Sequence, residues 1–309
     1  MGKPHPVSYI PGISPARSWR HLKPLDIILA LCGLAFVLWF LIRAAAVTQH
    51  HWDWAALTPY LFSHDAAGHW QAGALPRGLL TTLRVGAWSM LLALFSGGLV
   101  GILSAHQRGF AALPAVIYVN ALRNTPPLVL LFLVFFFAGS FFNDALLRVS
   151  AMARALPPAA QGLFSALLAP PDQLDRMVAA VLTLGLYEGA YVAEIVRAGL
   201  ESVPKSQWEA SAGQGMSPWQ QYRHVILPQA ARLMTPPLVS QTISTFKETT
   251  LASIISLPEL TFQSLEIMAV TRMTFELWLT TAALYLIISY AWAGLGHRLE
   301  RRRRWQPLE

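Results

Sequence analysis

Long apolar runs constrain the fold of this chain more than any other feature. An α-helix needs about 20 mostly apolar residues to cross a hydrocarbon layer of roughly 30 Å. Six runs are the expected spans: residues 27–47, 85–105, 113–142, 177–200, 235–257 and 277–296. In the third, Arg123–Asn124 interrupts the apolar run, and Thr125–Pro126–Pro127 is expected to break or restart the helix. Backbone polar groups within lipid must be satisfied inside the segment itself. The sequence therefore predicts an all-α polytopic membrane helical bundle.

Composition and charge agree with a membrane protein. Of the 309 residues, 54% are hydrophobic and only 13% are charged, against about a quarter in soluble domains. The net charge is +7, and a basic run, His297–Arg304, directly follows the last apolar segment. At that place a basic run favours anchoring on the cytoplasmic side of a membrane over nucleic-acid binding. The single cysteine, Cys32, excludes an intramolecular disulfide.

A histidine-containing loop raises the question of a metal site. Residues 48–76 are polar and rich in tryptophan and carry no lysine or arginine, which is typical of an external loop. Its potential ligands are His50, His51, His64, Asp65 and His69. Their spacing fits no standard zinc site, so we expect solvated loop side chains and no bound metal.

The polar segment 201–231 separates the fourth and fifth apolar runs. It is predicted to form two short helices joined by a glycine turn. The expected boundaries are an N-cap at Ser206 with Glu209 three residues later, a turn at Gly213 and Gly215, a second helix start at Ser217–Pro218 and a third at Pro228. Each boundary rests on an ordinary capping or backbone preference.

Within this segment seven residues follow a known spacing. They are Glu209, Ala210, Ser211, Gly215, Val225, Leu227 and Pro228. The arrangement resembles the EAA loop of ABC-importer permeases, with Ser211 in place of a second alanine and Val225 in place of isoleucine. Both replacements keep size or character. The resemblance implies a cytoplasmic loop whose short helix docks into a groove on a separate ATPase subunit.

Other segments resemble the polar amino-acid branch of these permeases, of the histidine, glutamine or general L-amino-acid type. They are residues 78–84 (GLLTTLR), 123–132 (RNTPPLVLLF), 190–197 (AYVAEIVR) and 246–251 (FKETTL). The resemblance implies a MetI-like permease core of about five spans over residues 76–297. The other expected divisions are a cytoplasmic tail at 1–24, an additional span and external loop at 25–75, and a basic tail at 298–309.

Charged and polar residues occur inside two of the expected spans. Charge at membrane depth is unfavourable by a few kcal/mol or more, so such residues normally face the protein interior or an aqueous path. Glu188 lies about twelve residues from one end of its span, or about 18 Å at 1.5 Å per residue. One face of this span carries Tyr187, Tyr191 and Glu194. A stripe of small residues lies roughly opposite and predicts close packing against another helix: Gly185, Gly189 and Ala193.

Two interpretations of these charges stay open. In the first, they line the path of a zwitterionic solute, and the candidates are Glu188, Tyr191, Glu194, Lys247, Glu248 and Thr249. In the second, they pair with one another and hold the bundle together. For Glu194 the second interpretation is favoured, because Arg197 follows at i+3. For Glu188 and Lys247 the residue pattern favours neither.

Catalytic motifs are missing from the sequence. It contains no G-x-x-x-x-G-K-[ST] phosphate loop, so this chain is not expected to hydrolyse ATP by that chemistry. Nor does any motif support a nucleophilic triad or a catalytic carboxylate pair. We expect a non-catalytic transport subunit without a cofactor of its own, with ATP and Mg²⁺ bound by the partner.

The resemblance implies a transmembrane permease subunit of an ATP-driven importer for polar amino acids. A periplasmic or extracellular binding protein would deliver the substrate, and a second permease subunit, identical or related, would complete the pathway. The expected location is the bacterial inner membrane, multi-pass, with both termini cytoplasmic and no nucleic-acid partner. The alternative from another class is an ion- or proton-coupled secondary amino-acid carrier that uses Glu188 and Lys247.

Overall fold

The computed structural model describes residues 24–48, 52–64, 68–106 and 109–304, and the chain divides into two compact units. The first unit ends at Trp52. Its described part contains one helix, α1 (Pro24–Thr48), over the first expected span. The second unit, Asp53–Glu309, contains all the elements discussed below.

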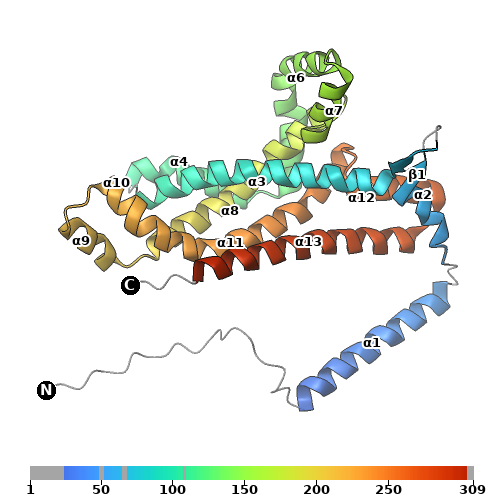
Figure 1. Ribbon diagram of the computed structural model, residues 1–309, viewed down its shortest axis with the longest axis horizontal. Coiled ribbons are helices and arrows are strands. Elements are labelled where there is room, and N and C mark those ends of the chain that lie inside the picture. The colour runs from blue at the N-terminus through green and yellow to red at the C-terminus, as the bar shows by residue number, and fades with distance from the viewer. Residues whose placement is uncertain (1–23, 49–51, 65–67, 107–108, 305–309) are drawn as a thin grey trace. The chain divides into compact units, whose positions relative to one another are not determined.

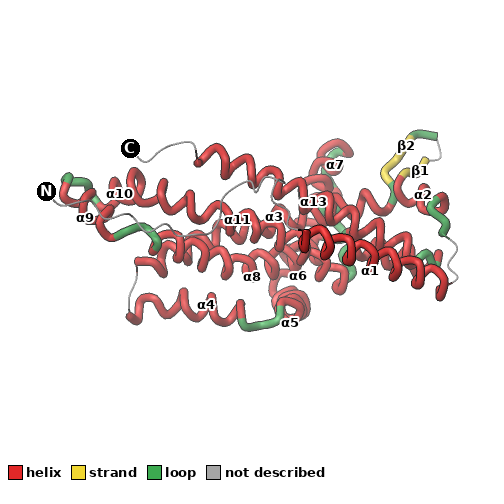
Figure 2. The backbone as a smooth tube through the Cα atoms, turned by 90° about the horizontal axis from the view of Figure 1, so that it is seen from below, coloured by secondary structure: helices red, strands yellow, loops and turns green. Residues whose placement is uncertain are grey.

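Among the described residues of the second unit, three helices are long and apolar enough to cross a membrane. They are α3 (Ala74–His106), α8 (Leu174–Glu201) and α13 (Thr274–Arg304). They confirm the predicted spans at 85–105, 177–200 and 277–296. Figures 1 and 2 show them running side by side with α11 (Leu227–Glu248). This bundle of long helices is the frame on which the candidate sites are built.

The third expected span is broken. Helix α4 (Leu113–Arg123) ends before Thr125, and α5 (Pro127–Phe132) continues into the π-helical segment η4 (Leu133–Ala138). The two parts meet at 104°. The break follows from Pro126 and Pro127, because proline lacks the amide hydrogen that would continue a helix and restrains the residue before it.

The fifth span begins earlier than predicted. Helix α11 starts at Leu227 with Pro228 in its first turn, and Pro236 and Pro237 lie inside it. The expected start at Thr235 is wrong, because the Thr235 hydroxyl donates to the Ala231 carbonyl at 2.6 Å and so bonds within the helix instead of capping it. After Glu248 the chain tightens into the 3₁₀ segment η6 (Thr249–Ile255).

Several short elements differ from the predicted loops. Residues 143–175, expected to hold one short helix at most, contain most of α6 (Gly139–Arg154) and all of α7 (Pro158–Leu167), which project from the bundle in Figure 1. Helix α12 (Leu260–Thr271) was not predicted at all. Before α3 lie η2 (Ala55–Leu57), α2 (Thr58–Leu61) and an antiparallel pair, β1 (Phe62–His64) and β2 (Trp70–Ala72), with Phe62 opposite Ala72. The 3₁₀ turn η3 (Gly109–Ala112) precedes α4.

Helices α3 and α8 approach closely through small residues. A Cβ atom built on Gly101 of α3 would lie 2.6 Å from the Ala193 carbonyl oxygen of α8, and one on Gly97 would overlap the Gly189 carbonyl. The predicted small-residue stripe of α8 therefore does pack against another helix. This close contact fixes the face of α8 that carries its polar side chains.

Candidate functional site

The segment between α8 and α11 forms a helix–turn–helix at one end of the bundle (Figure 1). It consists of α9 (Lys205–Gly213), α10 (Pro218–Gln221) and the π-helical segment η5 (Tyr222–Ile226). We call residues 201–231 the coupling segment. Two short helices joined by a glycine turn were predicted here, and the structure confirms that arrangement.

One of the two predicted caps is correct. Ser217 forms a capping box with Gln220: the Gln220 amide donates to the Ser217 hydroxyl at 3.4 Å, and the Ser217 amide donates to Gln220 Oε1 at 2.8 Å. The predicted cap at Ser206 is wrong. Helix α9 begins two residues earlier than that cap predicts, because the N-cap residue is Pro204, with φ −56° and ψ 140° and no side-chain hydrogen bond. Ser206 therefore lies inside the first turn.

The turn after α9 requires a glycine at one position. Gly215 has φ = +77°. Its amide donates to the Ala212 carbonyl at 2.9 Å, and the Met216 amide donates to the Ser211 carbonyl at 3.3 Å. This pair of bonds is a Schellman motif with Gly215 at C′, the position where side-chain-free backbone is favoured. Gly213, the last residue of α9, has no such requirement.

Apolar contacts anchor the coupling segment to the long helices. Ile226 is fully buried in a cluster that includes Val192, Val196 and Leu200 of α8. The rings of Trp208 and Tyr222 lie 6.0 Å apart in an edge-on contact that links α9 to η5. Burial raises the pKa of the Tyr222 phenol above its ordinary value. A displacement of α9 would therefore be passed to α8 and α11.

The seven residues of the predicted loop pattern divide into two groups. Ser211 is buried, and its hydroxyl donates to the Trp208 carbonyl at 2.9 Å, so a serine fits where the pattern has alanine. Val225 is half-buried in the same apolar cluster. The residues that are exposed, and so available to a partner, are Glu209, Ala210, Gly215, Leu227 and Pro228. The pattern did not indicate Trp208, Tyr222 or Ile226, which attach the loop.

A second group of polar residues lies between α8 and α11. Glu188 is fully buried, and Gln241 Nε2 donates to its Oε2 atom. The carboxyl group of Glu248 lies close enough to interact with that of Glu188. Glu188 Oε1 and Glu248 Oε2 are buried without a hydrogen-bond partner in the described part of the chain. Two neighbouring carboxyl groups with free oxygens suit a shared proton or a cationic group.

An aromatic and ionic row continues along α8 from this carboxyl pair. The hydroxyls of Tyr187 and Tyr191 are 3.2 Å apart, and the Arg123 guanidinium lies 5.1 Å from the centre of the Tyr191 ring. Arg197 donates to both carboxylate oxygens of Glu194, which confirms the predicted i, i+3 pair. Tyr191 thus lies between the carboxyl pair and that ion pair.

Two predicted path residues lie elsewhere. Lys247 is exposed, and no carboxylate lies within 4 Å of its ammonium in the described ranges, so the considered pairing of Lys247 with Glu188 is not found. Thr249 is buried, and its hydroxyl donates to the Phe246 carbonyl at 2.8 Å. Gln241 was missed, although it lies seven residues before Glu248 on the same helical face.

No metal-binding group is found among the described residues, where no three His, Cys, Asp or Glu side chains come together. His50, His51 and Asp65, considered as ligands above, lie outside those residues.

Comparisons of the chain with known proteins give a family of transport components and similar permeases. The sequence model of the family described as "Binding-protein-dependent transport system inner membrane component" matches residues 97–305. The glutamine transport system permease protein GlnP of Escherichia coli (strain K12) is 32% identical over 254 residues, 81% of this chain and 97% of that protein. The probable glutamine ABC transporter permease protein GlnP of Bacillus subtilis (strain 168) is 32% identical over 229 residues, 73% of this chain and 92% of that protein.

A solved structure is similar as well. The crystal structure of an amino acid ABC transporter with histidines has a TM-score of 0.61 and 26% sequence identity. The similarity covers 82% of this chain and 100% of that chain.

Proposed function

Since this chain belongs to the family of binding-protein-dependent transport system inner membrane components, we propose that it forms part of the pathway by which a polar amino acid enters the cell. It is a permease subunit of an ABC amino-acid importer. The observation that carries this conclusion is the 32% identity to the E. coli glutamine permease over 97% of that protein's length. The members of this family are the membrane components of transport systems. We therefore assign ATP hydrolysis to a separate ATPase subunit, which binds ATP and Mg²⁺.

The exposed face of α9 is the proposed docking surface for that ATPase. Glu209 and Ala210 are exposed and do not belong to the apolar cluster that holds the segment. Closure of the ATPases on ATP would move α9, and the buried contacts of Ile226 and Trp208 would pass that movement to α8 and α11. The result is a shift in population between inward- and outward-open states.

The charge distribution supports an orientation for the bundle. The basic end of α13, which includes Arg298 and Arg301–Arg304, lies at the same end of the bundle as the coupling segment (Figure 1). Basic residues favour the cytoplasmic side. We therefore assign the coupling segment and the C-terminus to the cytoplasm of a bacterial inner membrane, and the basic residues of the N-terminal tail favour the same side for the N-terminus. A second permease subunit and a solute-binding protein would complete the importer.

The carboxyl pair of Glu188 and Glu248 is the proposed contact for the solute ammonium. Each residue has a buried oxygen without a partner among the residues described, and Tyr191 lies on the same helix face. An ammonium group placed there would offset the repulsion between the two carboxylates. Glu194, Lys247 and Thr249 are less suited to this role, because the first is paired, the second points away and the third bonds within its own helix.

The family assignment favours the importer over the ion-coupled carrier, because its members depend on a binding protein. The carrier hypothesis also relied on Glu188 acting with Lys247, and these residues do not form a pair.

A pull-down in mild detergent tests the assembly. The tagged chain is expected to co-purify with an ATPase that carries a phosphate loop, together with a second permease if the pathway is a heterodimer. Mass spectrometry identifies the partners. Purification of the chain alone, under conditions that keep a known ABC importer intact, would contradict the proposed assembly.

A further inference from the structure

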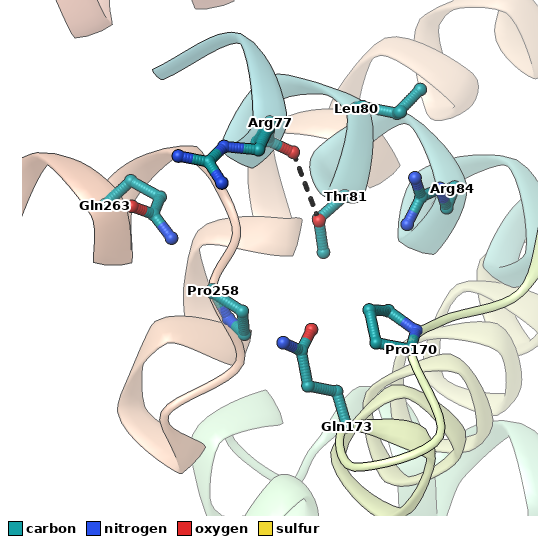
Figure 3. Close-up of a pocket in the computed structure, with 8 residues that line it drawn as sticks. All are labelled: Arg77, Leu80, Thr81, Arg84, Pro170, Gln173, Pro258 and Gln263. Atoms are coloured by element: carbon teal, nitrogen blue, oxygen red, sulfur yellow. Dashed lines mark hydrogen bonds between the residues drawn. The ribbon is translucent and has the colours of Figure 1, made fainter. Parts of the chain in front are cut away.

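We infer that a cavity at the end of the bundle opposite the coupling segment binds a carboxylate group, that of the amino acid on its way in. This inference rests on the proposed function and adds a binding site to it. The cavity has a volume of about 340 Å³, within the range of small-molecule sites. Its polar lining consists of Arg77, Thr81, Arg84, Gln173 and Gln263 (Figure 3).

Three chain segments bring these residues together at one end of the bundle. The first turns of α3 supply both arginines, the residue before α8 supplies Gln173, and the first turn of α12 supplies Gln263. Helix α8 has 28 residues, which is about 42 Å at 1.5 Å per residue. The cavity and the coupling segment lie at its two ends, so a cytoplasmic coupling segment places the cavity on the outer side.

The cavity carries positive charge that the described residues do not neutralise. No carboxylate lies within 4 Å of either guanidinium in the parts of the chain described by the structure. Arg77 Nε donates to the Gly73 carbonyl at 3.2 Å. Arg84 is half-buried, and its Nε atom is buried without an acceptor. A buried donor on a charged group is unfavourable unless it is paired, so the site favours an anionic ligand.

The buried carboxylate of Glu259, which follows the cavity-lining Pro258 in the chain, forms hydrogen bonds to other groups. Glu259 accepts hydrogen bonds from the Phe262 amide at 2.7 Å, the Tyr285 hydroxyl at 2.9 Å and the Thr82 hydroxyl at 3.3 Å. It caps α12 and ties that helix to α3 and α13. It therefore fixes one wall of the cavity and does not serve as the counter-ion of Arg84.

The lining groups match the shape of a carboxylate. A guanidinium presents a planar fork of donors that can hold both oxygens at once. The amides of Gln173 and Gln263 add further donors. In Figure 3 the Gln173 side chain reaches between Pro170 and Pro258 toward Thr81. These two prolines line the cavity on either side of Gln173 and leave space for a small planar group such as a carboxylate.

The same chemistry would attract a second kind of oxyanion. Arginines at the end of a membrane bundle also bind the phosphate of lipid head groups. The test must therefore separate an amino-acid carboxylate from a phosphate.

Arginine modification of the assembled complex provides that test. The complex is treated with p-hydroxyphenylglyoxal, and the modification of Arg84 is followed by peptide mass spectrometry. Ligands are L-glutamine, L-glutamate or L-histidine, with L-glutaminamide as the matched compound without a carboxylate and inorganic phosphate as the head-group probe. Arg154, exposed on α6, is the internal control. We expect at least one of the three amino acids to slow the modification of Arg84 several-fold, L-glutaminamide to have no effect and Arg154 to react equally throughout.

Three results would overturn the inference: no protection by any of the three amino acids, equal protection by L-glutamine and L-glutaminamide, or protection by phosphate alone. The variant Arg84→Gln provides a second readout. It should raise the KM of ATP-driven uptake about tenfold or more, because a hydrogen bond to a charged group contributes about 1.5–3 kcal/mol. Arg154→Gln should leave KM unchanged. An unchanged KM in Arg84→Gln would also contradict the site.

ATP-driven uptake and ATPase content, measured on the same preparation, separate the two proposals. If ATP-driven uptake is intact but no amino acid protects Arg84, the carboxylate site is contradicted and the proposed function is not. Absence of both uptake and ATPase defeats the proposed function.

Discussion

Gly215 is the residue at which a single backbone angle tests the proposed docking of the ATPase. Its φ of +77° belongs to the Schellman turn that ends α9 and fixes the direction of the following chain. Left-handed backbone is unfavourable by roughly 1–2 kcal/mol for a residue with a Cβ atom. Space is not the issue, because a Cβ atom at this position would meet nothing within 4 Å.

The variant Gly215→Ala should therefore loosen the turn and reduce the amount of ATPase that co-purifies with the chain. Gly213→Ala is the matched control, since it adds the same methyl group two residues away, also in open space but without a positive φ. The ratio of ATPase to permease in a detergent pull-down measures the effect. Equal ratios for the two variants would show that the turn geometry does not matter for docking.

Substitution of Glu188 can distinguish a role in binding the solute from a role in holding the helix bundle together. Glu188→Gln keeps the size of the side chain and removes its charge. We expect the amount of assembled complex to stay the same and the KM of uptake to rise about tenfold, the equivalent of about 1.4 kcal/mol. Glu201→Gln, an exposed partner of Arg197 on the same helix, should have little effect. Loss of assembled complex in Glu188→Gln would favour the structural role instead.

At the scale of elements, the contact between α3 and α8 is the strictest steric requirement in the bundle. The backbone carbonyl of Ala193 leaves no room for a methyl group on Gly101. Because the obstacle is backbone, a side-chain rotation cannot relieve it.

Gly101→Ala should force the helices apart and lower stability by about 1–3 kcal/mol, the usual range for overpacking. Gly98→Ala, three residues away on the same helix, is the control, because a Cβ atom there meets nothing within 4 Å. Thermal unfolding of the purified protein in detergent measures the difference. A Tm for Gly101→Ala as high as that of Gly98→Ala would contradict the close packing.

The sequence predicted the elements whose signal is long and uniform. Uncharged runs of about 20 residues identified α3 and α13, and the spacing of small residues in α8 indicated a packing face. Only one short helix was expected where α6 and α7 lie, and α12 was not predicted, because these helices carry no comparable signal. The start of α11 was misplaced because Pro236 and Pro237 read as a helix start, whereas the helix tolerates them in its interior.

In the candidate site, too, the sequence indicated some residues and missed others. The resemblance to the permease loop pattern indicated Glu209 and Gly215, but not Trp208 and Ile226, which anchor the segment through contacts with distant residues. Glu188 and Glu248 were found because charge in an apolar run is conspicuous. Gln241, which donates to Glu188, was missed because an uncharged amide in α11 gives no such signal.

At the scale of the whole molecule, the two ends of the bundle have different tasks. The coupling segment at one end exposes Glu209 and Ala210 to a partner, and the cavity at the other end gathers Arg77 and Arg84. The carboxyl pair of Glu188 and Glu248 lies between them on the long helices. Helix α8 connects all three regions. Movement of the coupling segment can therefore change whether the carboxyl pair and the cavity are open to the outer or the cytoplasmic side of the membrane.

The most direct measurement is uptake of a labelled polar amino acid by proteoliposomes that contain the purified complex, its ATPase and its binding protein. An ATP-driven importer should show uptake that requires ATP and the binding protein and that continues when an uncoupler removes the ion gradients. Uptake that needs no ATP and stops with the uncoupler would contradict the proposed function.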